Sequence, residues 1–229
     1  MLHDYYYLRQ YESAVAAPAA GNPAFDAYTQ GSNEQWVATM TVNHTPSGTP
    51  RGVVVLIAGG AYSVDEVTGV TYGGQAMSRA AFDADVATEL GVAWVYFLGT
   101  GVPTGAQDAV VSLDQGGNQS EKVVSVVTLT GDADLTVADS DSIADDQADP
   151  SLTLSAGSDT GIALACAYTG HDVPATGLTV LSGVTSMGTH DWGAYGGAWV
   201  RQTTPATGDF TIGWTALSDD VAMVGIMVV

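Results

Sequence analysis

Carboxylates dominate the chemistry that this sequence could perform, and many of them gather in one stretch. Residues 131–150 (GDADLTVADSDSIADDQADP) hold seven aspartates, among them Asp139, Asp141, Asp145 and Asp146. Such hard oxygen atoms are the ligands that Ca²⁺ prefers. The spacing differs from that of an EF-hand, which needs a glycine at its sixth position and a glutamate at its twelfth. We therefore expect either a solvated acidic loop or a loop that Ca²⁺ or another cation bridges.

The remaining candidates for chemistry are histidines and one cysteine. His171-Asp172 and His190-Asp191 each place an imidazole beside an acid near a turn, so they could share a metal if their loops met, or be separate loop-tip residues. Cys166, flanked by alanines, is expected in the core. The sequence contains no G-x-S-x-G, H-E-x-x-H or G-x-x-x-x-G-K-[ST] motif. We expect no catalytic residue and no enzymatic activity.

Aromatic residues offer contact surfaces at two places. Tyr5, Tyr6 and Tyr7 stand in the N-terminal segment, where exposed tyrosines would suit packing against a neighbouring subunit. The segment THDWGAYGGAW brings Trp192 and Tyr195 together with glycines. It is expected either to face a ligand or a subunit from a loop, or to be a glycine-bulged strand packed in the core.

The charge balance limits the partners. The chain has 25 acidic and 5 basic residues and a net charge of −20, which repels nucleic-acid phosphate. It is expected either to be an acidic surface protein or to be adapted to high salt, where charged side chains keep the surface hydrated. No apolar run reaches the roughly 18 residues that span a bilayer, and no secretory signal pattern opens the chain.

Hydrophobic periodicity indicates the elements that must position these residues. Trp36, Ala38, Met40 and Val42 fall on one face of a half-buried strand. Residues 53–58 are apolar on both faces, as a central strand is. Residues 80–90 fit either a short helix or an irregular loop. About twelve short strands are expected and no repeat at a fixed period, which together predict an all-β, antiparallel β-sandwich.

Two regions follow from this pattern. Residues 1–34 have no steady period and are expected to be an extended arm that docks the protein, or else a first strand with a long loop. Residues 35–229 are expected to form a single β-sandwich domain.

Three stretches carry a resemblance to a known group of proteins. They are VTYGGQAM, WVYFLGTGVPTGAQDAVVSL and DFTIGWTALSDDVAMVGIMVV. Together they resemble, over residues 36–229, the jelly-roll-like β-sandwich module of tailed-virus virion proteins. The resemblance implies a non-enzymatic virion protein, a capsid-surface decoration or turret component, that forms a homo-oligomer and contacts other virion proteins. The alternative is a tail, fibre or extracellular module that binds a host glycan or receptor.

Overall fold

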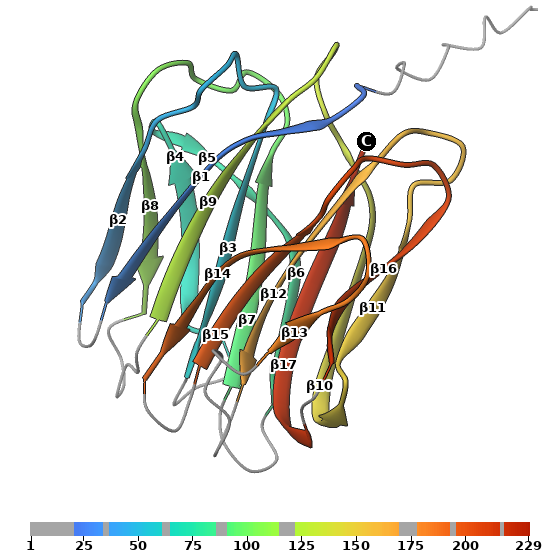
Figure 1. The fold of residues 1–229 in the computed structure, drawn as a ribbon. Coiled ribbons are helices and arrows are strands. Elements are labelled where there is room, and N and C mark those ends of the chain that lie inside the picture. The colour runs from blue at the N-terminus through green and yellow to red at the C-terminus, as the bar shows by residue number, and fades with distance from the viewer. Residues whose placement is uncertain are drawn as a thin grey trace, which may run out of the picture.

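The regular structure of this protein is entirely β. The computed structural model describes residues 21–33, 37–60, 65–85, 91–114, 122–169, 178–192, 196–215 and 218–229. Within these residues the chain forms seventeen strands, all paired antiparallel, and no helix (Figure 1). The all-β, antiparallel prediction is confirmed, although the strands outnumber the twelve expected.

The first half of the chain forms two sheets. The first central sheet has the order β1 (Ala24–Asn33), β9 (Lys122–Thr130), β3 (Gly52–Gly60), β7 (Gly91–Leu98), β6 (Ser78–Asp85). The first outer sheet has the order β2 (Thr39–His44), β8 (Gln107–Leu113), β4 (Val67–Tyr72), β5 (Gln75–Ala76). The alternation expected for β2 is confirmed where it is described, because Met40 and Val42 are buried while Thr39 and Thr41 are exposed.

The second half forms two more sheets. The second central sheet has the order β10 (Val137–Ala148), β17 (Ser218–Val228), β12 (Ile162–Thr169), β15 (Gly196–Gln202), β14 (Val184–Asp191). The second outer sheet has the order β11 (Ser151–Ser155), β16 (Asp209–Thr215), β13 (Thr179–Val180).

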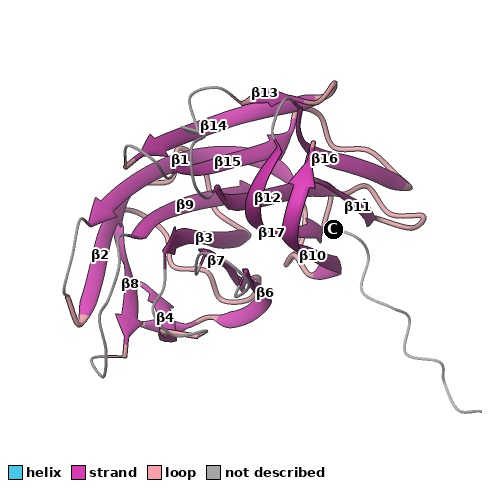
Figure 2. Ribbon diagram, turned by 90° about the horizontal axis from the view of Figure 1, so that it is seen from below, coloured by secondary structure: helices cyan, strands magenta, loops and turns pink. Residues whose placement is uncertain are grey.

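Three hydrophobic clusters stack the four sheets into four layers, whose ends are seen in Figure 2. One cluster lies between each outer sheet and its central sheet, and the third lies between the two central sheets. The central sheets are therefore covered on both faces. This explains why β3 and β12 are apolar without alternation: Val55 faces the first outer sheet, whereas its neighbours Val54 and Leu56 face the second central sheet.

The second half repeats the strand order of the first. If β1 is matched with β10, the orders of the two central sheets correspond strand for strand, and β2, β8 and β4 correspond to β11, β16 and β13. Four of the five bulges correspond as well, and the fifth, at Thr68 in β4, has no counterpart in β13. Asp26 interrupts the pairing of β1, and Ala138 interrupts that of the matching strand β10. Ala80 interrupts the pairing of β6, and Met187 interrupts that of the matching strand β14. A β-bulge is a specific local feature, so its recurrence at matched places supports an internal repeat that the sequence analysis did not find.

Three segments differ from expectation. Ala24–Asn33, inside the predicted arm, is strand β1 and pairs with β9 along its length, so a boundary at residue 34 does not separate arm from sheet. The docking role of residues 1–20 stays a prediction, because they lie outside the described residues. The Asp-rich segment is not a loop, since Val137–Ala148 forms β10. Strand β6 (Ser78–Asp85) includes residues 80–85, where a short helix or an irregular loop was expected.

Candidate functional site

The acidic cluster lies on an edge strand. The carboxylate of Asp139 accepts hydrogen bonds from the backbone N–H groups of Ser140 and Ser155, both at 2.9 Å. Asp141 accepts one from the N–H of Ser142 at 2.9 Å. The bond from Ser155 ties β10 to the neighbouring strand β11. Charged side chains on an outermost strand also oppose pairing with another sheet edge, so these aspartates have a structural role.

The metal hypothesis receives no geometric support from the described residues. Asp145 and Asp146 lie on β10, but their side chains are outside the described part of the structure. No group of three or more His, Cys, Asp or Glu side chains that could hold a metal ion occurs where side chains are described. Binding of Ca²⁺ by these aspartates therefore remains a prediction.

A buried chain of hydrogen bonds runs from β2 into the first central sheet. The Thr128 hydroxyl donates to Asp26 Oδ2 at 2.8 Å. Its oxygen therefore accepts from His44 Nε2–H, 3.0 Å away. The other ring nitrogen, Nδ1, must then accept from the Thr29 hydroxyl at 2.9 Å. Burial lowers the pKa of His44, against the opposing effect of the Asp26 charge, so the imidazole stays neutral.

The histidine at the centre of this chain of hydrogen bonds is enclosed by the protein. His44 has 0% relative exposure. Backbone N–H groups of Ser47 and Gly48 hold the Asp26 carboxylate at 3.2 and 2.7 Å. The Tyr72 ring lies 6.4 Å from that of His44, and burial, followed by the charge of Asp26, raises the pKa of Tyr72 to about 12. The chain of bonds fastens the first outer sheet to β1 and β9.

A second buried polar group in the first half of the chain is the ion pair between Lys122 and Glu66. Lys122, the only lysine of the chain, donates to Glu66 Oε2 at 2.5 Å and to the Gly60 carbonyl at 3.2 Å. The side chains are 1% and 5% exposed. The ammonium lies 6.0 Å from the centre of the Trp94 ring. Burial lowers the pKa of Lys122, and the hydrogen bond to Glu66 opposes that shift.

Cys166 is in the core, as expected. It has 0% relative exposure, and its thiol donates weakly to the carbonyls of Ile57 at 3.5 Å and Trp94 at 3.7 Å. Burial raises the pKa of Cys166 far above its ordinary value. Because the thiolate is the reactive form of cysteine, this residue is not suited to be a nucleophile.

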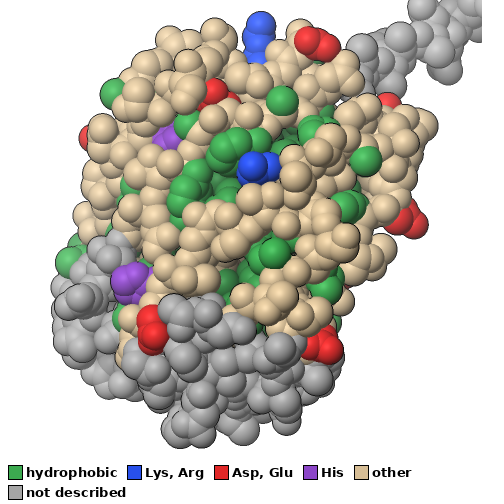
Figure 3. All heavy atoms as spheres, viewed as in Figure 1, with side chains coloured by type: hydrophobic (Ala, Val, Ile, Leu, Met, Phe, Trp, Pro, Cys, Tyr) green, Lys and Arg blue, Asp and Glu red, His purple; other side chains and the backbone are tan. Residues whose placement is uncertain are grey.

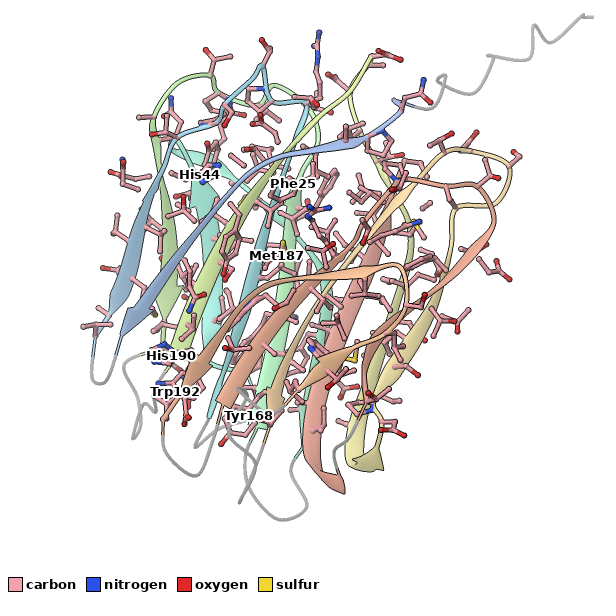
Figure 4. The ribbon with its side chains drawn as sticks, in the orientation of Figure 1. Phe25, His44, Tyr168, Met187, His190 and Trp192 are labelled. Atoms are coloured by element: carbon pink, nitrogen blue, oxygen red, sulfur yellow. The ribbon has the colours of Figure 1, made fainter. Side chains whose placement is uncertain are left out.

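A partly accessible aromatic surface lies where β1 runs beside β14, and we call it the β1/β14 seam. It is defined by Phe25 and Tyr28 on β1, Met187 on β14, Trp192 just after β14, and Arg201 on β15. All five are half-buried. Figure 4 shows Phe25, Met187 and Trp192 following one another along this face. The four apolar members pack against the cluster between the central sheets.

Local contacts show how closely the two strands approach at the seam. A Cβ atom at Gly188 of β14 would lie 2.7 Å from the Tyr28 hydroxyl and 2.7 Å from Gln30 Oε1, so a larger residue there would displace the ends of these two side chains. The guanidinium of Arg201 lies 4.1 Å from the centre of the Phe25 ring. Such a cation–π contact stabilises both groups.

Trp192 marks the far end of the seam. Its ring lies 4.9 Å from that of His190, edge to face, and 6.3 Å from that of Tyr168. Its Nε1 atom is buried without a hydrogen-bond partner among the described residues. Of the predicted contact residues, the structure thus places Trp192 in a half-buried aromatic cluster.

Several predicted residues fall outside the described part of the chain. They are Tyr5, Tyr6, Tyr7, Tyr195, His171 and Asp172. The sequence analysis missed the His44 and Lys122 networks. The first had a usable signal, because His44 continues the buried alternation of Met40 and Val42.

Comparisons with protein-family models, curated proteins and solved structures found no match to this chain. The described residues also contain no helix long and apolar enough to cross a membrane. The sheets and the seam alone define the class: an all-β protein of stacked antiparallel sheets with an internal repeat.

Proposed function

We propose that this chain is a non-enzymatic structural component of a tailed-virus particle, a capsid-surface decoration or turret protein built from two jelly-roll-like β-sandwiches. It would act on the virion by assembly, through its N-terminal segment and its sheet edges, with other virion proteins and with copies of itself as partners.

The strand pairing supports the jelly-roll part of this proposal and carries it furthest. A jelly roll arises when a long hairpin is rolled up, which pairs the first strand with the last, the second with the next to last, and so on inward. In the first half β1 pairs with β9, β2 with β8, β3 with β7, and β4 with β5. In the second half β10 pairs with β17, β11 with β16, and β12 with β15.

The polar interior supports a structural role. The carboxylate of Asp26 is held by Thr128 and two backbone N–H groups, and Glu66 holds the ammonium of Lys122. These groups fasten one sheet to another. A rigid body of this kind suits a protein whose work is to present surfaces to neighbours.

Solution mass and particle binding test the proposal. The full chain and a form lacking residues 1–20 would be compared in high salt; β1 begins at Ala24, so this deletion spares every described strand. We expect the full chain to form a defined oligomer that co-sediments with particles. The form without residues 1–20 should be a folded monomer that does not co-sediment with them. A monomer in both forms without particle binding would contradict the proposal.

One observation favours the alternative, a module that binds a host glycan. The half-buried ring of Trp192 sits beside His190 and Tyr168, and sugar rings can stack on the accessible faces of aromatic rings. A glycan array with Trp192→Ala would test it. Phe210→Ala on β16, in the second outer sheet, is the matched control. Glycan binding that only Trp192→Ala removes would favour the alternative.

A further inference from the structure

The seam is the side on which the two central sheets leave their edges open. At the opposite side β6 packs against β10 and β17, so those edges cover one another. β1 and β14 approach less closely and pair on one side only, β1 with β9 and β14 with β15. Each outermost strand therefore offers backbone N–H and C=O groups that an added strand could pair with.

The side chains of the seam define the chemistry of an occupant. Figure 3 shows a basic side chain surrounded by hydrophobic ones on the face where β1 and β14 lie. Phe25, Tyr28, Met187 and Trp192 favour aromatic partners, since thioether and ring contacts add to the burial of area.

Arg201 adds a charge preference. Arg79 pairs with Asp65, and Lys122 pairs with Glu66. Arg201 forms no ion pair with any described residue and donates only to the backbone carbonyls of Gln202 and Thr203. Desolvation by burial lowers its pKa. In a chain of net charge −20, a half-buried guanidinium that no carboxylate of the described residues neutralises is a place for an acid from another segment.

The first twelve residues of the chain have the matching composition. MLHDYYYLRQYE contains four tyrosines, two leucines and the acids Asp4 and Glu12. They precede Gly21, whose carbonyl accepts from the N–H of Asp132 at 2.7 Å and is thereby fixed on the connection between β9 and β10. Asn22 donates to the Asp132 carboxylate at 2.8 Å.

The length of the segment permits it to reach another molecule. Twenty extended residues span at most about 70 Å, whereas a ten-residue strand such as β1 covers roughly 34 Å. Gly21 and Asn22 are held by Asp132, and residues 13–20 leave enough chain for residues 1–12 to reach the seam of a neighbouring copy.

We propose that residues 1–12 of one copy dock as an added strand in the β1/β14 seam of a neighbouring copy, with Tyr6 and Leu8 on the apolar side chains of the seam and Asp4 or Glu12, which share their face of the strand, on Arg201. This inference rests on the proposed function in one respect, that the protein assembles with itself. The chemistry of the seam is independent of the particle to which the assembly belongs.

Photo-crosslinking of the full chain tests the docking directly. A benzophenone amino acid replaces Tyr6, and equal amounts of ¹⁵N-labelled and unlabelled protein are mixed before illumination. We expect crosslinks to peptides containing Phe25, Met187 or Trp192, half of them joining a labelled to an unlabelled copy. Crosslinks confined to one copy, crosslinks to other surfaces, or none would overturn the inference.

A charge-reversal series tests the role of Arg201. We expect Arg201→Glu to weaken self-association at least about tenfold, because an acid would then face an acid. Combining it with Asp4→Lys and Glu12→Lys should restore association. Arg51→Glu, the same change at an exposed residue in the turn before β3, should leave it unaltered. Equal effects of Arg201→Glu and Arg51→Glu would contradict the pairing.

The two proposals fail differently. If the protein oligomerises and binds particles while the crosslinks lie elsewhere, the seam inference is wrong and the proposed function stands. If the crosslinks join two seams but no particle is bound, the docking stands and the virion role is wrong.

Discussion

Replacement of Lys122 by methionine should destabilise the protein strongly. The side chains of Lys122 and Glu66 are 1% and 5% exposed, so the change leaves a carboxylate buried without its cation. Breaking a buried pair in this way costs about 3–5 kcal/mol. Methionine keeps most of the apolar stem against Trp94, so lost packing adds little. For a chain of this size about 4 kcal/mol corresponds to a fall in melting temperature of roughly 10 °C.

Denaturant and thermal unfolding at pH 7 measure this loss, and two variants control it. Lys122→Met combined with Glu66→Leu removes both charges and should recover stability to within about 1 kcal/mol of wild type. Arg79→Met breaks the Arg79–Asp65 pair, whose side chains are 42% and 38% exposed. That change should cost less than about 1 kcal/mol.

The reasoning is refuted if Lys122→Met unfolds within about 1 kcal/mol of wild type, or if the double variant is no more stable than the single one.

Four further predictions address other features. Burial holds the pKa of His44 below its ordinary value, so as the pH falls the unfolded chain binds a proton at this residue before the folded protein does. The free energy of unfolding should therefore fall by up to about 1.4 kcal/mol per pH unit below about pH 6.5 because of this group. The variant His44→Gln should lose that slope and the control His190→Gln should keep it; an unchanged slope in His44→Gln would count against the network. If the net charge of −20 reflects high-salt adaptation, stability should rise from about 0.1 M to about 2 M salt, beyond the range where screening saturates, and a flat curve would sink that hypothesis. If the aspartates of β10 bind Ca²⁺, a chelator should lower the melting temperature and Asp141→Asn should abolish the effect; no chelator effect would leave them as edge protection alone. Cys166 should react with a thiol reagent only after unfolding, so rapid labelling of the folded protein would show that the core opens.

The sequence predicted strands well where the residue pattern reflects whether one face or both faces of the strand are covered by another sheet. Met40 and Val42 alternate with threonines because the first outer sheet has one face in solvent, and residues 53–58 are apolar throughout because two clusters enclose β3. The β10 strand was missed since aspartate disfavours strands. An outermost strand paired with the apolar β17 tolerates it, because its other edge needs no partner.

The internal repeat was hidden because matched strands share a pattern and not their residues. Facing the outer sheets, β3 carries Val53 and Val55 where β12 carries Ala163 and Ala165. The similar segments GVAWV and GGAWV on β7 and β15 even mislead. Trp94 lies in the cluster under the first outer sheet, whereas Trp199 lies between the central sheets. A register shift of one residue turns a side chain to the opposite face of the sheet, and the sequences of these two segments do not reveal such a shift.

The contact residues could be predicted only in part. Trp192 was found because its glycine-rich surroundings set it apart from the core tryptophans. Phe25, Met187 and Arg201 carry no such signal, since they come from β1, β14 and β15 and meet only when the two central sheets pack together.

The matched bulges give the two halves a freedom that two identical subunits lack. In a symmetric pair of separate chains, any substitution alters both copies at once. Here one pair of matched bulges has Asp26 in β1 and Ala138 in β10. The other pair has Ala80 in β6 and Met187 in β14. One site can therefore anchor a buried histidine network while its counterpart stays apolar, and one edge can be sealed while the other remains open. Within a single chain, the repeated scaffold has become two differently specialised faces.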